Sequence, residues 1–346
     1  MLKNKVISFM MVVILLCFSA VNVFALEQTT VKQKGMSYVT WARDTFSSSS
    51  SDASLRKLKE TGTEYVALVV TWYQDKFDAP LIGPNPSKTP SDTSVVHAIK
   101  TIHDSGMKVM LKPHLDFLDS SEGKWRSDIE FSDDTGWEAW FKNYQDFLMH
   151  YIEIANKENI EMFCLGTELS STTINQPERW KKMIQNIRAV YKGQLTYAAN
   201  WYKEYDEILF WDMLDYAGID AYFPLIEKDK PTKEELITAW EPWLKQVEKW
   251  QAKINKPVIF SEIGYKSSIN SADKPWEHMP GREVDLQLQA DCYEVIFELF
   301  WNKPWFYGVY WWYWGASPKI GGAANRQFTP QNKPAEDVLK KWYKAS

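Results

Sequence analysis

The stretch Val258-Ile259-Phe260-Ser261-Glu262-Ile263-Gly264-Tyr265 has a counterpart earlier in the chain, Phe163-Cys164-Leu165-Gly166-Thr167-Glu168-Leu169. Each is a short apolar run, which is typical of a strand buried on both faces of a parallel sheet. Each run carries one glutamate near its end, just before a polar loop. An ionised carboxylate in such an apolar setting costs free energy, so its presence indicates a function rather than packing.

Strand-like and helix-like stretches alternate along the whole chain after residue 35. The predicted strands are Met36–Trp41, Tyr65–Tyr73, Lys108–Asp116, Glu161–Leu169, Leu195–Trp201, Tyr216–Phe223, Pro257–Gly264 and Phe306–Trp314. The predicted helices are Ala53–Glu60, Thr93–Ser105, Trp137–Lys157, Pro177–Tyr191, Tyr205–Asp212, Lys233–Lys253, Glu283–Trp301 and Ala335–Tyr343. Eight such pairs predict an α/β fold of one (β/α)8 TIM barrel.

The connecting segments support the same architecture. Connections from helix to strand are short, such as Lys192-Gly193 and Asn255-Lys256. Connections from strand to helix are long and rich in proline, glycine and serine, such as Gln74–Asp92 and Lys266–Gly281. Long loops on one face and tight turns on the other are typical of a barrel that carries a functional site at its C-terminal rim.

The first 25 residues predict an export signal. Two lysines precede the apolar run 6–18, and Val23-Phe24-Ala25 fits the small-x-small pattern of a cleavage site. The run is too short to cross a membrane. We therefore expect cleavage near Ala25, a secreted protein without stable membrane insertion, and a mature chain of residues 26–346 that forms one catalytic domain.

Composition narrows the possible partners. The formal net charge of −5 argues against nucleic acid. The five histidines are scattered, without HExxH or paired-cysteine spacing, so we predict neither a metal site nor a cofactor. Cys164 falls in mid-strand and Cys292 in mid-helix, so both are predicted to be buried free thiols. We expect the protein to be a monomer.

Glu168 ends the fourth predicted strand and Glu262 ends the seventh, on opposite sides of a barrel of this size. Their side chains can therefore converge across its mouth. Two such carboxylates are the equipment for cleaving a glycosidic bond, because one protonates the leaving oxygen and the other attacks or activates water. A simpler interpretation is that each glutamate caps the following helix or pairs with a lysine.

Aromatic and polar residues at the strand ends predict a sugar-binding surface. The chain has 18 tryptophans, and flat rings with a polar N–H suit the apolar faces of sugars, although a large aromatic core is the alternative. By strand alternation Trp312 and Trp314 share a face, whereas Trp311 is assigned to packing. The predicted substrate-binding residues are Trp41, Trp72, His114, Asn200, Trp201, Tyr222, Trp312 and Trp314. His114 fits a core histidine equally well. Asp220 is expected to be structural, bonded to a backbone amide or paired with Lys112.

The segments Gly166-Thr167-Glu168-Leu169 and Ser261-Glu262-Ile263-Gly264-Tyr265 resemble the retaining glycosidases of clan A. Within that clan the chain is most similar to glycoside hydrolase family 113, whose described members are mainly β-mannanases. Further similarity lies in Lys34–Tyr38, in Lys112-Pro113-His114 and in Tyr310–Trp314, so it covers nearly all of the mature chain.

The resemblance implies Glu168 as acid/base and Glu262 as nucleophile of a secreted, retaining endo-β-1,4-mannanase that acts on mannan or glucomannan. Many clan members have asparagine before the acid/base, where it binds the sugar 2-hydroxyl, but this chain has Thr167. Three alternatives remain open. One is another retaining β-glycanase, acting on glucan or xylan, and the second is a barrel that binds carbohydrate without cleaving it. The third is a cell-wall-modifying partner protein that uses the rim for protein contacts.

Overall fold

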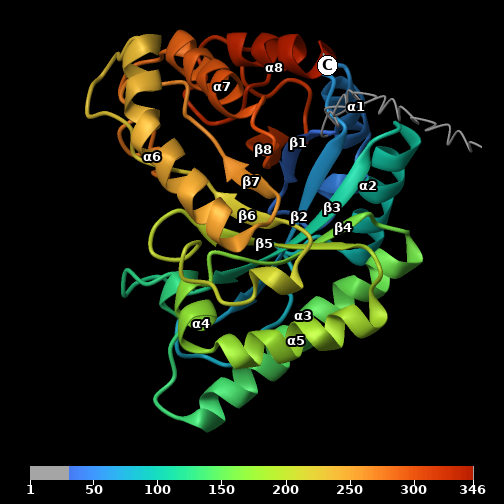
Figure 1. The fold of residues 1–346 in the computed structure, drawn as a ribbon. Helices are drawn as coiled ribbons and strands as arrows, with labels where there is room; N and C mark the ends of the chain where they lie inside the picture. Colours follow the sequence, from blue (N-terminus) through green and yellow to red (C-terminus); the bar gives the residue numbers. More distant parts are fainter. Residues whose placement is uncertain (1–30, 346) are drawn as a thin grey trace, which may run out of the picture. The chain divides into compact units, whose positions relative to one another are not determined.

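The computed structural model describes residues 31–345, which form a compact unit. The predicted export signal lies outside the described residues. Eight parallel strands close into a barrel in sequence order, as predicted (Figure 1). The strands are β1 (Gln33–Val39), β2 (Tyr65–Gln74), β3 (Lys108–Phe117), β4 (Met162–Thr167), β5 (Gln194–Asn200), β6 (Ala217–Asp220), β7 (Val258–Ile263) and β8 (Phe306–Gly315).

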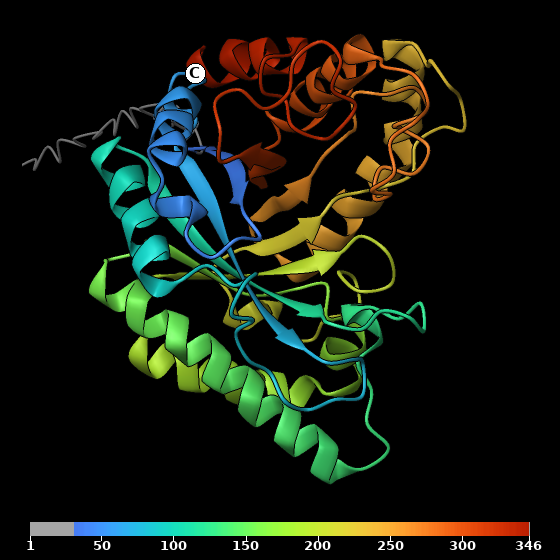
Figure 2. The same cartoon turned by 180° about the vertical axis from the view of Figure 1, so that it is seen from behind.

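Helices surround the barrel, and Figure 2 shows them from the opposite side. They are α1 (Ser49–Lys59), α2 (Asp92–Asp104), α3 (Asp134–Lys157), α4 (Ser170–Asn175), α5 (Pro177–Val190), α6 (Lys233–Ile254), α7 (Leu286–Phe300) and α8 (Pro334–Lys344). Local signals set several starts. Thr232 and Glu235 form a reciprocal capping box at α6, and proline opens α5 and α8.

The segment after β5 differs from the prediction, because the helix expected at Tyr205–Asp212 is absent. Only a short 3-10 helix forms there, at Trp211–Met213, while β4 is followed by two helices, α4 and α5. Lys203 adopts a left-handed backbone with φ of 52°, and Glu204 turns into the interior with no exposed surface. Hydrogen bonds from Tyr197, Thr173 and the Asn200 N–H hold the Glu204 carboxylate inside, and the segment forms turns in place of a helix.

Most of the aromatic residues are packed in the layer between the strands and the helices. Trp140 stacks on Tyr144 with ring centroids 4.8 Å apart, and Trp180 stacks on Phe210 at 5.5 Å. All four side chains are almost completely buried. The large aromatic core, which the composition left as an alternative, therefore accounts for many of these rings.

The structure also confirms the predictions for the two cysteines and for Trp311. Cys164 and Cys292 are free and fully buried, as predicted. Trp311 is fully buried and stacks on Tyr293 of α7 at 3.6 Å, which confirms its assignment to packing. Between residues 31 and 345, no helix is both long and apolar enough to cross a membrane.

Candidate active site

A cavity of about 1110 Å³ opens where the C-terminal ends of the strands meet. Most of the residues predicted from the sequence line it: Trp41, His114, Glu168, Asn200, Trp201, Tyr222, Glu262 and Trp312. They come from seven of the eight strands or from the loops that follow them, and only β2 contributes none of them. This position is the usual one for the functional site of a (β/α)8 barrel.

Glu262, in β7, is held at the cavity floor by three neighbouring side chains. The Lys112 Nζ donates to its Oε1 at 2.6 Å, and the Tyr222 hydroxyl donates to its Oε2 at 3.1 Å. The His114 Nε2 lies 3.4 Å from the same Oε1. Only 5% of Glu262 is exposed, so both oxygens are fixed by protein groups rather than by solvent.

These neighbours determine the charge of Glu262. Burial alone would raise the pKa of this carboxyl, but the Lys112 ammonium and then His114 outweigh burial and hold the pKa well below its usual range. Burial also lowers the pKa of His114 to about 4, so this imidazole is neutral at neutral pH. Glu262 is therefore an ionised carboxylate at every pH at which the protein would work.

Lys112 is fully buried and also lies 3.6 Å from Asp220 Oδ1. Asp220 has no exposed surface and accepts a hydrogen bond from Ser261 Oγ at 2.8 Å. Its predicted pairing with Lys112 is therefore confirmed. One ammonium thus sits between two carboxylates, which supports its positive charge despite burial and raises its pKa to about 12.

Glu168 lies just after β4 and has a different environment. Its Oε1 accepts a 3.3 Å hydrogen bond from Asn200 Nδ2, and Arg126 Nη1 lies 4.0 Å from its Oε2. Its backbone is left-handed, with φ of 54°, and its N–H donates to the Ala198 carbonyl at 2.9 Å. Non-glycine residues seldom adopt this conformation, and those that do cluster at functional sites.

Burial is the main reason why the pKa of Glu168 rises to about 7. The Arg126 guanidinium opposes this rise, while the negative charges of Glu262 and Glu204 add to it. The carboxyl is therefore protonated at acid pH and titrates near neutrality. Two carboxyls in one cavity with pKa values shifted in opposite directions are suited to act as an acid and as a carboxylate nucleophile.

Aromatic rings form the walls of the cavity. Trp312 lies parallel to the His114 imidazole, at an angle of 4° and a centroid distance of 6.1 Å. Trp201 stacks on Trp276 from the loop after β7, at 5.3 Å. Trp41 is about half exposed above β1. Such partly exposed ring faces are suited to sugar rings.

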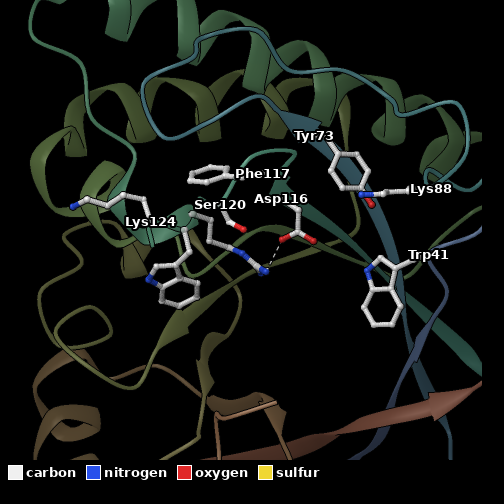
Figure 3. Close-up of a pocket in the computed structure, with 9 residues that line it drawn as sticks. Trp41, Tyr73, Lys88, Asp116, Phe117, Ser120 and Lys124 are labelled. Atoms are coloured by element: carbon white, nitrogen blue, oxygen red, sulfur yellow. Dashed lines mark hydrogen bonds and ion pairs between the residues drawn. The ribbon is translucent and has the colours of Figure 1, made fainter. Parts of the chain in front are cut away.

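A second pocket of about 430 Å³ continues the cavity toward the loops after β2 and β3. It shares Trp41, Asp116, Trp125 and Arg126 with the main cavity. In Figure 3, Asp116 points into this pocket, with Trp41 and Lys88 to one side of it and Phe117 to the other. The dashed line marks its 2.8 Å ion pair with Arg126. The two pockets together make one extended cleft.

Trp72 and Trp314 do not line the cleft, so their predicted role in substrate binding is corrected. Trp72 stacks on Phe147 of α3 at 4.9 Å and donates to the Tyr151 hydroxyl at 3.2 Å. Its position on β2 faces the helical layer and not the barrel mouth. The wrong assignment came from its place near a strand end, which does not say on which side of the barrel wall the side chain lies.

Trp314 is fully buried, and its Nε1 donates to Ser54 Oγ of α1 at 3.0 Å. The expected alternation with Trp312 fails because the pairing of β8 with β1 shifts. Trp311 pairs with Met36 and Trp314 with Tyr38, so three steps along β8 match two along β1. A bulge of this kind reverses the sides of the residues that follow it.

Several functional residues were not predicted from the sequence. Lys112, which is buried and does not line the cleft, was expected only to pair with Asp220, although it also bonds Glu262. Arg126 and Trp125 lie in the long loop after β3, where no periodic pattern indicates which side chains turn inward. Arg126 had one usable signal, since an arginine among aromatic residues in a rim loop is a frequent binding group.

Thr167 occupies the place of the clan's usual asparagine. It is buried, and its Oγ1 has no hydrogen-bond partner among residues 31–345. Asn200 from β5 donates to the Glu168 carboxylate. In the same described range, no group of three or more histidine, cysteine, aspartate or glutamate side chains has the geometry to hold a metal ion.

The sequence profile of Glycoside Hydrolase Family 113 matches residues 36–333, which is most of the chain. The chain belongs to glycoside hydrolase family 113. It is a glycoside hydrolase, as the paired glutamates and the resemblance predicted. No match was found among proteins with curated functions.

Solved structures of family 113 enzymes resemble the chain over nearly its whole length. A β-1,4-mannanase of the family, solved as a complex, is 28% identical with a TM-score of 0.82, over 91% of this chain and 100% of that one. The β-mannanase from Alicyclobacillus acidocaldarius in complex with ManMIm is 29% identical, with a TM-score of 0.81 over 91% and 98%. A β-glucuronidase from Ruminococcus gnavus, 14% identical with a TM-score of 0.58 over 90% and 50%, shares the fold alone.

Proposed function

We propose that this family 113 member is a secreted endo-β-1,4-mannanase that retains the anomeric configuration. The observation that carries the mechanism is the opposite shift in pKa of Glu168 and Glu262 within one cavity. The substrate class is supported by the likeness to family 113 enzymes whose names describe them as β-mannanases.

In the first step, Glu262 attacks the anomeric carbon of the sugar bound over Trp312. Its carboxylate is ready to attack because Lys112 and His114 favour the ionised form. The Tyr222 hydroxyl donates to the oxygen that Lys112 does not contact, so the two oxygens are held by different donors. The attack forms a glycosyl ester and breaks the bond to the leaving oxygen.

Glu168 supplies the proton for that leaving oxygen. With a pKa near 7 it still carries a proton in mildly acidic solution, so it can act as the general acid. After the first product leaves, the same carboxylate removes a proton from water, which attacks the glycosyl ester and releases the sugar with its original configuration.

The extended cleft supports endo action. The second pocket continues past Asp116 and Arg126, beyond the two glutamates, and it is lined by the half-exposed rings of Trp41 and Trp125. A long polysaccharide could therefore lie across the site with sugars on both sides of the bond that breaks.

The first experiment is product analysis with β-mannan, glucomannan, xylan, β-glucan and short manno-oligosaccharides. Release of a range of manno-oligosaccharides supports the proposal, and proton NMR of the first product should show the β-anomer. Cleavage of xylan or β-glucan alone would keep the mechanism but replace the substrate. A folded protein that binds mannan without cleaving it would indicate a carbohydrate-binding barrel.

The catalytic roles are tested with Glu262→Ala and Glu168→Ala. Each should lower kcat on mannohexaose by about 10⁴-fold or more while folding is retained, because each removes a group that takes part in bond making or breaking. Near-wild-type activity in Glu262→Ala would rule out that residue as nucleophile. Export is tested separately, since secreted material should begin near Leu26 when its N-terminus is sequenced.

A further inference from the structure

Glu204 lies in the turn after β5, directly before the segment where a helix had been predicted, and it has no exposed surface. Three donors surround its carboxylate. Tyr197 Oη donates to Oε1 at 2.7 Å, Thr173 Oγ1 donates to Oε1 at 2.9 Å, and the Asn200 backbone N–H donates to Oε2 at 2.7 Å. None of the salt bridges within residues 31–345 includes Glu204.

Burying a carboxylate that has three hydrogen-bond donors but no cation costs desolvation free energy. An apolar residue of similar size would pack there without the desolvation of a charge. Burial indeed raises the pKa of Glu204 to about 7, although its hydrogen bonds oppose this rise. The buried Glu204 carboxyl and its three donors are therefore explained better by a functional role than by a gain in stability.

The first connection from Glu204 to Glu168 passes through Asn200. The Asn200 backbone is fixed by Glu204 Oε2, and its Oδ1 accepts from the Tyr202 N–H at 2.8 Å. This leaves Asn200 Nδ2 directed at Glu168 Oε1, 3.3 Å away. Displacement of the Asn200 backbone would therefore move the side chain that orients Glu168.

The second connection passes through Tyr197. Its hydroxyl donates to Glu204 and at the same time accepts from the Leu169 N–H at 2.7 Å. Leu169 follows Glu168, whose backbone is left-handed. The strained turn is thus held on one side by Ala198 O and on the other by the Tyr197 hydroxyl.

We propose that Glu204 is a positioning residue that holds Glu168 in place through Asn200 and Tyr197, a role that rests on the proposed function of Glu168 as acid/base. Glu204 touches neither substrate nor the reacting atoms. It acts by fixing the turn that carries the acid/base and the amide that orients it. The carboxylate suits this role because it can accept from all three donors at once.

The charge of Glu204 gives the proposal a second, independent readout. The titratable and charged groups near this network are Tyr197 on β5, Tyr144 on α3 behind it, Glu168 after β4, and Arg126 and Glu262, which face Glu168. Among them, ionised Glu204 raises the pKa of Glu168. Loss of this charge should therefore lower that pKa and move the basic limb of the pH–activity profile toward acid.

The test compares Glu204→Gln with wild type on two substrates. One is mannopentaose, whose leaving group needs a proton. The other is 2,4-dinitrophenyl β-mannobioside, whose leaving group departs without one. Glutamine keeps only one acceptor oxygen, so its NH2 group would face either the Asn200 N–H or the hydroxyls of Tyr197 and Thr173. One side of the network is then broken, and Glu168 should lose its orientation. We expect kcat/KM on mannopentaose to fall about 100-fold, and kcat/KM on the aryl glycoside to stay within about threefold of wild type.

Glu207→Gln is the matched control, because Glu207 is an exposed glutamate in the same turn. It should leave both values of kcat/KM and the basic limb unchanged. Equal losses on both substrates in Glu204→Gln would indicate general damage and overturn the proposal. An unchanged basic limb would overturn it as well, since a structural role alone does not move that limb in a set direction.

Tyr197→Phe provides a second route if Glu204→Gln does not fold. It removes only the hydroxyl that joins Glu204 to Leu169, and it should also show a selective loss of kcat/KM on mannopentaose, of about 10- to 100-fold. Glu168→Ala separates the two hypotheses. If Glu168→Ala keeps its activity on mannopentaose, the proposed function fails. If Glu168→Ala loses it while Glu204→Gln and Tyr197→Phe do not, only this inference fails.

Discussion

Lys112 Nζ lies 2.6 Å from Oε1 of Glu262, and the lysine side chain has no exposed surface. A buried ammonium in direct contact with a carboxylate stabilises the ionised form of that carboxylate far more than an exposed one would, because water does not screen the pair. The nucleophilic state of Glu262 therefore depends on a residue that does not line the cleft.

Replacing this lysine should impair catalysis at acid pH most of all. Lys112→Met removes the positive charge, so the pKa of Glu262 rises and its carboxylate is lost at a higher pH than in wild type. We expect the acid limb of kcat/KM to move to higher pH and kcat to fall about 100-fold at its optimum. The measurement is kcat/KM on mannohexaose between pH 4 and 8.

Lys108→Met is the control for this change. Lys108 begins the same strand, at the opposite end of the barrel, and donates to the Tyr65 hydroxyl at 3.2 Å. Its replacement should leave the acid limb in place. An acid limb that also stays in place in Lys112→Met would show that the ammonium does not control Glu262.

Glu168 makes the stability of the protein depend on pH. Its ordinary pKa of 4.5 rises to about 7 on folding, so the folded chain binds the proton more tightly, and stability falls as pH rises between these values. Glu168→Gln cannot ionise and should avoid this loss. We expect it to exceed wild type in free energy of unfolding by ~1–3 kcal/mol at pH 8, with little difference at pH 4.5.

Urea denaturation at both pH values measures this difference. Glu178→Gln serves as the comparison, because this glutamate is largely exposed on α5. It should not change the pH dependence. If Glu168→Gln differed from wild type by the same amount at pH 4.5 and pH 8, the carboxyl would have no raised pKa in the folded state.

Trp125 tests the extension of the cleft. Its ring is 42% exposed in the second pocket, so it is available to a sugar distant from the bond that breaks. Trp125→Ala should lower kcat/KM on mannohexaose about tenfold, which corresponds to the loss of one stacking contact. The loss on mannotriose should be smaller, because a short chain leaves that pocket empty.

Leu209→Ala gives the comparison for Trp125, since Leu209 is exposed and does not line either pocket. Both substrates should then react at the wild-type rate. Equal losses on mannohexaose and mannotriose in Trp125→Ala would mean that the second pocket holds no separate sugar.

Trp314 and Trp312 should respond differently to the same replacement. Trp314→Phe loses the hydrogen bond to Ser54 within the barrel wall, so we expect a loss of ~1–3 kcal/mol in stability and activity within about twofold of wild type. Trp312→Phe should instead raise KM. Thermal unfolding and Michaelis kinetics on mannohexaose measure the effects of both variants. A raised KM in Trp314→Phe would indicate that Trp314 binds substrate after all.

The barrel could be predicted because each of its strands is marked locally. The runs at Glu161–Leu169 and Pro257–Gly264 are apolar, bounded by polar loops, and spaced by helix-length segments. Since strand ends gather on one rim, the same pattern also indicated that Glu168 and Glu262 share a site. These predictions depend on periodicity, which a single sequence displays directly.

The remaining features depend on long-range contacts that periodicity does not report. The register shift that separates Trp314 from Trp312 arises from pairing with β1, more than 270 residues earlier in the chain. The inward turn of Arg126 depends on Asp116 and on the packing of its loop. The helix predicted at Tyr205–Asp212 does not form, because hydrogen bonds hold the preceding residue, Glu204, in the interior and override the helix propensity of the segment.

The left-handed backbone at Glu168 bears on how a bound polysaccharide could be captured for structural study. Alanine at position 168 still has a β-carbon, which disfavours the left-handed backbone found there. Glycine has no β-carbon and adopts this backbone freely. Glu168→Gly should therefore be as inactive as Glu168→Ala on mannan and more stable by ~1 kcal/mol. Glu168→Gly is the better choice for soaking intact oligosaccharides into crystals, because it combines the loss of cleavage with the higher stability.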